Sequence, residues 1–245
     1  TFCAHWHVYR GTPVRFWMES ELVDIFGVDV RPSAETADAI YDQIAATLAQ
    51  PDFRPRQLMD RFDIAFMATT DDPCDDLHFH QQLAGDPTFT RRVAPTFRPD
   101  RYLEAARDGW TDLVDRLADV SGVATDTYEG WVKAMENRRA YFKANGAVSS
   151  DHAHADLDTT PLPHDEAGRL YRKARAGQIT VTEGDALRKT MLFEMARMAS
   201  EDGLVMTLHP AAFRNHHTPT YLKYGADVGA DIPTSVEATR SLRPM

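Results

Sequence analysis

Short apolar runs that lead directly into polar segments recur along this chain. The runs cover residues 64–68, 92–95, 146–148 and 203–207, and the segments after them carry threonine, serine, aspartate, arginine and histidine. Short apolar runs bounded by polar residues are typical of buried strands. The pattern therefore predicts four strands, each followed by polar side chains at its carboxyl end.

Helical spacing of apolar residues fills most of the remaining sequence. Residues 17–50 are expected to be helical and carry no strand signal, and Pro55 opens a short helix over residues 55–62. Further helices are expected over residues 75–84, 100–120, 126–145, 164–176 and 182–202. Strands that alternate with helices favour parallel βαβ units, and four repeats of one pattern favour a (β/α) barrel.

The number of these units indicates how much of a barrel the chain contains. Four strand-plus-helix units are half of the eight that a closed barrel requires. We therefore expect an α/β fold in which residues 51–245 form part of a (β/α)8 TIM-type barrel, with the remaining strands outside this chain. Residues 1–50 are expected to form a helical insertion or extension beside it.

Composition narrows the function classes. A chain of 245 residues with 43% apolar and 26% charged residues can bury a large core. The net charge of −10 argues against nucleic-acid or anionic-membrane partners, and no apolar run approaches the length of a membrane span. The two cysteines, Cys3 and Cys74, are too few for a disulfide framework. A reducing compartment, the cytoplasm, is therefore expected.

Arginine and histidine occupy the rim positions of two predicted strands. Arg98 follows the second strand, and His209 and Arg214 follow the fourth. Barrel enzymes build their sites at the carboxyl ends of strands. A guanidinium group binds a carboxylate through two parallel hydrogen bonds, and an imidazole can hydrogen-bond a substrate or move a proton near neutral pH. These residues suit an anionic small molecule.

Each of these features also has a structural interpretation. Arg98 is able to form a surface salt bridge with Asp100, and His209 is able to serve as a hydrogen-bonded core residue. Residues 69–73 have the composition of an N-cap and turn. For this last segment we favour the structural role, with the loop lining the mouth of the barrel.

Seven short motifs occur in an order and spacing that resemble one family. They are Arg10-Gly11-Thr12-Pro13 with Trp17, Phe26-Gly27, Thr69-Thr70-Asp71-Asp72-Pro73, Phe97-Arg98-Pro99-Asp100, Ser150-Asp151-His152, Leu208-His209-Pro210-Ala211 with Arg214-Asn215, and Gly225-Ala226-Asp227-Val228-Gly229. Together they make the chain similar, along nearly its whole length, to the uronate isomerase (glucuronate isomerase) family of the amidohydrolase superfamily.

The resemblance implies a distorted (β/α)8 barrel with a mainly helical insertion and an isomerase. Such an enzyme interconverts D-glucuronate with D-fructuronate and D-galacturonate with D-tagaturonate. By resemblance, His209 is a catalytic residue and Arg98 and Arg214 contact the uronate, while Asp151 and His152 are expected to bind substrate or support the site from the rim. The resemblance also implies a divalent metal, with zinc favoured, whose ligands fall before residue 1 or after residue 245.

Pairs of histidines separated by one residue need attention because this spacing is the metal signature of the superfamily. The pairs are His5 and His7, His78 and His80, and His152 and His154. Alternate residues share a face only on a strand, so the pair in the predicted helix over 75–84 is not expected to bind one ion. The third pair has Asp156 as an apparent further ligand. We predict no metal ligand within this chain.

Two other function classes stay open at this point. A metal-dependent hydrolase of the same superfamily is expected to carry a metal-binding lysine or histidine on its fourth to sixth strands, and the fourth-strand position here carries Asp151 and His152 without a lysine. A noncatalytic module that binds sugar acids is the other alternative. A homo-oligomer is also left open.

Overall fold

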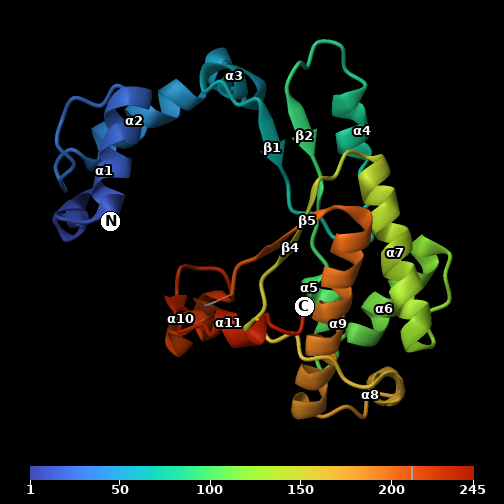
Figure 1. Ribbon diagram of the computed structural model, residues 1–245. Helices are drawn as coiled ribbons and strands as arrows, with labels where there is room; N and C mark the ends of the chain where they lie inside the picture. Colours follow the sequence, from blue (N-terminus) through green and yellow to red (C-terminus); the bar gives the residue numbers. More distant parts are fainter. Residues whose placement is uncertain (211) are drawn as a thin grey trace. The chain divides into compact units, whose positions relative to one another are not determined.

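The computed structural model describes residues 1–210 and 212–245, which form two compact units, Thr1–Ala65 and Phe66–Met245. Figure 1 shows the order of their helices and strands along the chain. Residues 51–65 belong to the first unit, whereas the sequence-based division falls between residues 50 and 51. The interpretation of the two parts as an insertion and a partial barrel stays a prediction.

The first unit is helical, as predicted. Its elements are η1 (Cys3–Tyr9), α1 (Pro13–Ser20), η2 (Glu21–Ile25), α2 (Ala37–Leu48), η3 (Pro51–Phe53) and α3 (Pro55–Arg61). Residues 27–36 lie outside any helix, so the predicted helical stretch over residues 17–50 is interrupted. The small core of this unit is built on the buried side chains of Trp6, Leu22 and Ile40.

The second unit contains parallel strands, and the strands that pair with each other are consecutive in the sequence. The strands are β1 (Phe66–Ala68), β2 (Arg92–Ala94), β3 (Thr96–Phe97), β4 (Ser149–His152) and β5 (Val205–Leu208). β1 pairs with β2, and β4 lies between β3 and β5. A further parallel bridge joins Asp71 to Phe97. This order is the one that successive βαβ units produce.

The third predicted strand is displaced along the sequence. Residues 146–148 were expected to form it, but β4 begins at Ser149. Gly146 has a φ of +92°, a left-handed conformation that belongs to a turn rather than a strand. Asp151 and His152 therefore lie within β4, where alternation places them on opposite faces.

The helices predicted over residues 75–84, 126–145, 164–176 and 182–202 are confirmed with small changes at their ends. Between β1 and β5 the helices are α4 (His78–Ala84), α5 (Asp100–Leu103), α6 (Trp110–Ser121), α7 (Tyr128–Ala144), α8 (His164–Arg175) and α9 (Val181–Asp202). The helix expected over residues 100–120 is two helices, α5 and α6. The sequence did not predict the antiparallel pair β6 (Ala212–Phe213) and β7 (Ile232–Pro233), or helices α10 (Thr218–Tyr224) and α11 (Ala238–Ser241).

Helices α7 and α9 pack against the strands and hold their ends in place (Figure 1). The ring of Phe97 on β3 meets Phe142 of α7 edge to face, with ring centres 5.1 Å apart. Helix α9 passes so close to Ala106 that a Cβ at Gly184 would lie 2.6 Å from the Ala106 Cβ. A larger residue at Gly184 would therefore displace the helix that leads into β5.

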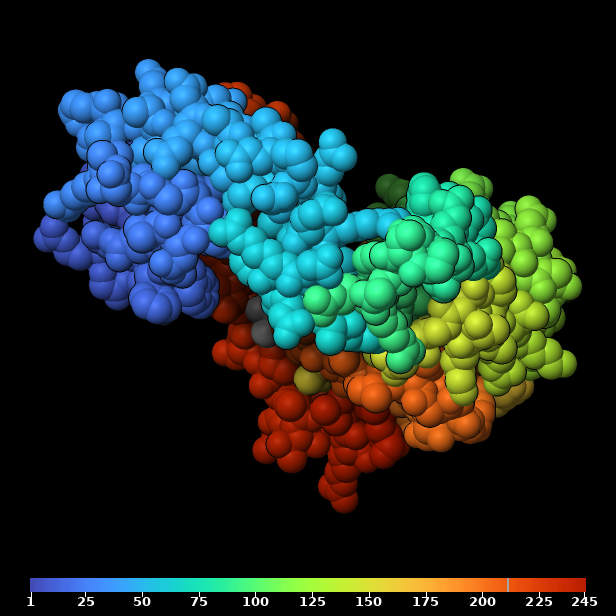
Figure 2. Space-filling model, turned by 90° about the horizontal axis from the view of Figure 1, so that it is seen from above, coloured from blue at the N-terminus to red at the C-terminus, as the bar shows by residue number. Residues whose placement is uncertain are grey.

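Helix α4 lies against the end of α7 in both views of the molecule (Figures 1 and 2). The Gln81 side-chain amide donates hydrogen bonds to the Tyr141 hydroxyl and to Asn145.

Among residues 1–210 and 212–245, no helix combines the length and apolar character needed to cross a membrane.

Candidate active site

Polar side chains from three neighbouring strands meet at the carboxyl ends of β3, β4 and β5. Arg98 comes directly after β3, Asp151 lies on β4, and His209 follows β5. The His209 Nε2 atom lies 2.8 Å from Asp151 Oδ1, and Arg98 Nη1 lies 3.6 Å from Asp151 Oδ2. Parallel pairing of the strands thus joins residues that are 53 and 58 positions apart in the sequence.

Asp151 is the centre of this cluster. The hydroxyl of Thr207, on the neighbouring strand β5, donates to its carboxylate at 2.8 Å. Burial alone would raise the pKa of Asp151, but the hydrogen bonds from His209 and Thr207 and the charge of Arg98 together hold the pKa below its usual value. Asp151 is therefore ionised at neutral pH and able to orient the His209 imidazole.

Arg98 connects two carboxylates. Its Nε donates to Asp100 Oδ2 at 3.0 Å, and its Nη1 faces Asp151. The salt bridge with Asp100 that the structural interpretation expected is therefore confirmed. It does not remove Arg98 from the candidate site, because the side chain is also part of the wall of a cavity.

This cavity has a volume of about 710 Å³ and unites segments that are far apart in the sequence. It is lined by Thr70, Asp71, Asp72, Arg98, Asp100, Arg101, Arg107, Ala153, Arg214, Asn215, Ala226 and Asp227. Both predicted substrate-binding arginines are in this set, together with two arginines from the α5 region. The cavity therefore offers an anion several guanidinium groups within a single hollow.

Arg214 is held by acidic neighbours. Its Nη1 lies 2.9 Å from Asp231 Oδ2 and 3.8 Å from Asp227 Oδ1. The backbone N–H of Asn215 donates to the same Asp231 side chain at 2.8 Å. Asp231 thus fixes the segment that presents Arg214. Ala211, which belongs to the motif of residues 208–215, lies outside the described residues.

The loop of residues 69–73 forms the turn that its composition predicted, but it is not the predicted N-cap, because α4 begins at His78 with Leu77 at its N-cap position. Asp72 Oδ1 accepts a hydrogen bond from the Cys74 N–H at 2.9 Å, and Asp71 Oδ2 accepts one from the Thr96 N–H at 3.1 Å. These bonds satisfy backbone donors and fix the turn. Three residues of the loop also line the cavity, so the turn shapes one of its walls.

His152 lies apart from the cavity. Its side chain is fully buried, and it is not among the residues that line the 710 Å³ hollow. Burial, reinforced by the nearby His154 and Arg139, lowers the pKa of His152 to about 3. The ring is therefore neutral at physiological pH. The structure groups Arg98, Asp151 and His209 in one cluster and leaves His152 outside it.

The other histidine pairs have separate partners. His78 Nδ1 lies 2.6 Å from Asp76, whereas His80 Nε2 lies 2.8 Å from the Thr69 hydroxyl. Both residues lie on α4, as expected for a pair that does not share one face. His5 and His7 lie within the 3-10 helix η1.

The acidic residue beside the histidine pair His152 and His154 is not Asp156, as the sequence suggested. Asp156 is paired with Arg188, at 2.9 Å, and the carboxylate near His152 and His154 belongs to Asp100. One ligand atom from each of Asp100, His152 and His154 lies within 4.8 Å of the others. The sequence analysis missed Asp100 as a member of this group. The position of Asp100 just after β3, the strand beside β4, was the sequence feature that could have predicted its contact with these histidines.

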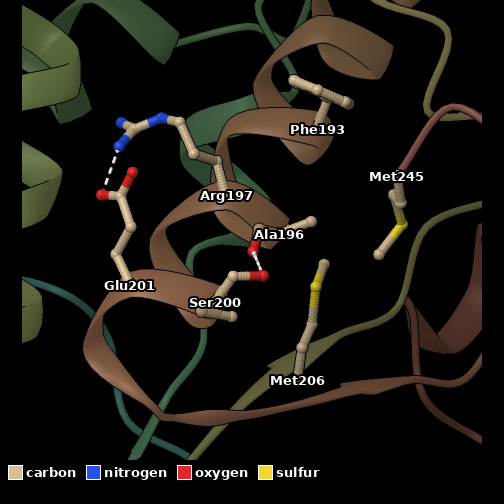
Figure 3. A pocket seen from close by; sticks show the side chains of 8 residues that line it. Phe193, Ala196, Arg197, Ser200, Glu201, Met206 and Met245 are labelled. Atoms are coloured by element: carbon tan, nitrogen blue, oxygen red, sulfur yellow. Dashed lines mark hydrogen bonds and ion pairs between the residues drawn. The ribbon is translucent and has the colours of Figure 1, made fainter.

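A second hollow, of about 600 Å³, lies over α9 and β5 and has a different character. Figure 3 shows Phe193, Met206 and Met245 around it. Its polar groups are already paired, because Arg197 Nη1 binds Glu201 at 2.6 Å and the Ser200 hydroxyl donates to the Ala196 carbonyl at 3.1 Å. A negatively charged sugar acid therefore suits the arginine-lined cavity better than it suits this second hollow.

Comparison with known proteins identifies relatives along the entire chain. The sequence profile of the glucuronate isomerase family matches residues 2–245. The uronate isomerase of Cutibacterium acnes is 56% identical over 243 residues, which is 99% of this chain and 52% of that protein. The uronate isomerase of Corynebacterium efficiens is 48% identical over 245 residues, covering 100% of this chain and 52% of that protein.

Solved structures agree with the sequence relatives. The crystal structure of glucuronate isomerase from Caulobacter crescentus matches with a TM-score of 0.91 at 35% identity, covering 99% of this chain and 50% of that one. The uronate isomerase structure from Thermotoga maritima matches with a TM-score of 0.89 at 27% identity, covering 99% and 53%. The chain spans about half the length of the curated relatives it matches. The family profile over residues 2–245 and relatives at 56% and 48% identity show that this chain belongs to the glucuronate isomerase family.

Proposed function

We propose that the full-length protein is a uronate isomerase that interconverts D-glucuronate with D-fructuronate and D-galacturonate with D-tagaturonate. The observation that carries this proposal is the contact of His209 with Asp151 at 2.8 Å, beside Arg98. A carboxylate-oriented imidazole next to a guanidinium can move a proton and stabilise negative charge. Family membership supports the same activity.

We also propose that the second unit is the central part of a distorted (β/α)8 TIM-type barrel with a mainly helical insertion. The parallel strands β1 to β5 lie in sequence order, with helices between most successive strands. The candidate site at their carboxyl ends is where barrel enzymes carry out their chemistry. The similarity to solved glucuronate isomerases is in line with this proposal.

The reaction is an internal redistribution of hydrogen. In the forward direction, the hydrogen on C2 leaves as a proton and one proton returns to C1, while the O2 hydroxyl proton is lost and O1 gains one through an enediol. The proposed role of His209, supported by its 2.8 Å contact with Asp151, is to exchange a proton with a substrate oxygen. Arg98 and Arg214 line the cavity where they can bind the uronate carboxylate and balance oxyanion charge. No residue of this chain is assigned as the carbon base.

The family implies a divalent metal, for which we favour zinc. When bound, such an ion would polarise a carbonyl oxygen. His209 and Asp151 are engaged with each other, and the resemblance assigns the metal's ligands to positions outside residues 1–245. Arg98, Asp151 and His209 do not form a ligand set, so the roles proposed for these three residues are substrate binding and proton movement.

We further propose a cytoplasmic enzyme that acts on a small uronate, and we leave a homo-oligomer as an open proposal. Cys3 and Cys74 are both free and buried, which is compatible with a reducing compartment. The net charge of −10 gives no support to a nucleic-acid partner.

The test is conversion of D-glucuronate and D-galacturonate to their keto acids by the purified full-length protein, with and without chelator. We expect turnover of at least one sugar acid. A folded, zinc-loaded protein that binds a uronate without converting it would favour the noncatalytic alternative. Hydrolysis of an amide or ester in place of isomerisation would favour a superfamily hydrolase.

A further inference from the structure

Three potential metal ligands converge on the buried side of β4. His152 and the nearby His154 are alternate residues, and their rings stack with centres 6.3 Å apart and planes 27° apart. Asp100, the first residue of α5, follows the neighbouring strand β3 and faces them. We propose that Asp100, His152 and His154 bind a divalent transition-metal ion.

The distances fit a site that closes slightly around an ion. Asp100 Oδ1 lies 3.5 Å from His154 Nε2 and 3.9 Å from His152 Nδ1. All three ligand atoms lie within 4.8 Å of one another. Ligands about 2.1 Å from a tetrahedral zinc ion are about 3.4 Å apart. Side-chain adjustments of less than about 1 Å would therefore bring the three atoms to coordination distance.

The facing atoms are buried and lack partners. Asp100 Oδ1, His152 Nδ1 and His154 Nε2 have no hydrogen-bond partner among the described residues. The side chains of His152 and His154 are at most 1% exposed. A buried polar atom without a partner costs about 1–3 kcal/mol, so three of them aimed at one point indicate a cation at that point.

The surrounding hydrogen bonds leave acceptor atoms facing the centre. Glu104 Oε1 lies 2.8 Å from His154 Nδ1, so this nitrogen donates and Nε2 carries the lone pair. Asp100 Oδ2 already accepts from Arg98 and from the Ala153 N–H, which leaves Oδ1 aimed at the histidines. A carboxylate that orients a histidine from its far side is the usual support of a metal ligand.

The ligand set selects the type of ion. Two imidazoles and one carboxylate suit zinc, iron, nickel or copper, whereas magnesium and calcium prefer oxygen ligands. Asp100 also holds Arg98, which lines the arginine-rich cavity. An ion on Asp100 would therefore fix the position of a residue in the candidate site. The metal site itself stands independently of the proposed isomerase activity.

The decisive experiment locates the ion directly. Crystals of the full-length protein, stripped with chelator and reloaded with Zn²⁺, would be measured on both sides of the zinc absorption edge. We expect an anomalous peak about 2.0–2.2 Å from Asp100 Oδ1, His152 Nδ1 and His154 Nε2. If saturating Zn²⁺ gives no peak there, the three side chains do not bind the ion and the proposal is wrong.

A pair of matched variants tests the same site in solution. His154→Gln removes a ligand, whereas His164→Gln changes an exposed histidine on α8 that pairs with Glu129. Zinc per chain would be measured by mass spectrometry after reloading, with folding checked by circular dichroism. We expect a folded His154→Gln protein to hold one zinc fewer than wild type, and His164→Gln to hold the same amount. Equal zinc in wild type and a folded His154→Gln protein would overturn the proposal, and the anomalous map decides if His154→Gln does not fold.

Discussion

Asp151 and His152 are neighbours on β4 but lie in contrasting surroundings. Asp151 faces His209, Thr207 and Arg98, all of which supply hydrogen-bond donors or positive charge. His152 faces the interior, where neither of its ring nitrogens has a partner among the described residues.

The difference shows how one short strand serves two kinds of chemistry. A carboxylate with several donors stays charged although it is half-buried, so it can orient a catalytic group. A buried imidazole without donors stays neutral and keeps its lone pair, as a metal ligand must. The two faces can be tested separately, because substitutions on the Asp151 face should change turnover and substitutions on the His152 face should change metal content.

The largest expected effect is on the Asp151 face. Asp151→Asn removes the carboxylate that orients His209, so we expect kcat/KM for uronates to fall by about 10³-fold, within the range of general acid–base contributions. The measurement is steady-state isomerisation. Asp165→Asn, at an exposed position on α8, is the control and should keep wild-type activity. Wild-type kcat/KM in Asp151→Asn would remove Asp151 from the mechanism.

A paired carboxylate outside the Arg98–Asp151–His209 cluster should affect stability more than turnover. Asp202 binds the buried Arg139 through two hydrogen bonds, of 2.6 and 3.0 Å. Asp202→Asn leaves this guanidinium without its counter-charge, so we expect the free energy of unfolding to fall by about 3 kcal/mol. Urea denaturation at pH 7 measures it. An unchanged unfolding midpoint would show that water compensates the lost pair.

The same pair predicts a pH dependence. Burial would raise the pKa of Asp202, but hydrogen bonds from Arg139 and the Leu204 N–H and the charge of Arg139 lower it below 3.8. The stabilisation is therefore fully present above about pH 4 and is lost as the pH falls through the lowered pKa. Wild type should lose stability more steeply below pH 4 than Asp202→Asn, as measured by urea denaturation across pH. Parallel stability curves would contradict this assignment.

Arg214 tests whether the cavity binds the substrate. Arg214→Ala removes a charged contact worth about 1.5–3 kcal/mol, so we expect kcat/KM to fall by about 10-fold to 100-fold with little change in folding. The same outcome is expected for Arg98→Ala, which also loses its contact with Asp151. Uronate turnover and thermal unfolding are the measurements. An unchanged kcat/KM would remove that arginine from the site.

The smallest effect should come from a single hydrogen bond. Thr207→Val keeps the shape of the β5 side chain but removes its donation to Asp151. A loss of about 0.5–1.5 kcal/mol, or a few-fold in kcat/KM, is expected because His209 and Arg98 still support the carboxylate. A loss as large as that of Asp151→Asn would mean that Thr207 itself touches the substrate.

The sequence by itself determined the alternation of strands and helices and the residues at the rim. Apolar runs and helical spacing report which side chains are buried locally, and this information predicted β1, β2, β5 and the main helices. The motifs identified Arg98, Asp151, His209 and Arg214, of which the first three form one cluster and Arg98 and Arg214 share a cavity.

Only the tertiary structure decided which of these groups meet. The displacement of β4 to Ser149–His152 put Asp151 and His152 on opposite faces, and Asp100 in place of Asp156 came to lie beside the histidines. The pairing of Arg214 with Asp231 was likewise absent from any local pattern. Local periodicity carries no information on strand order or register. Contacts between residues about 50 positions apart are fixed only when neighbouring strands pair.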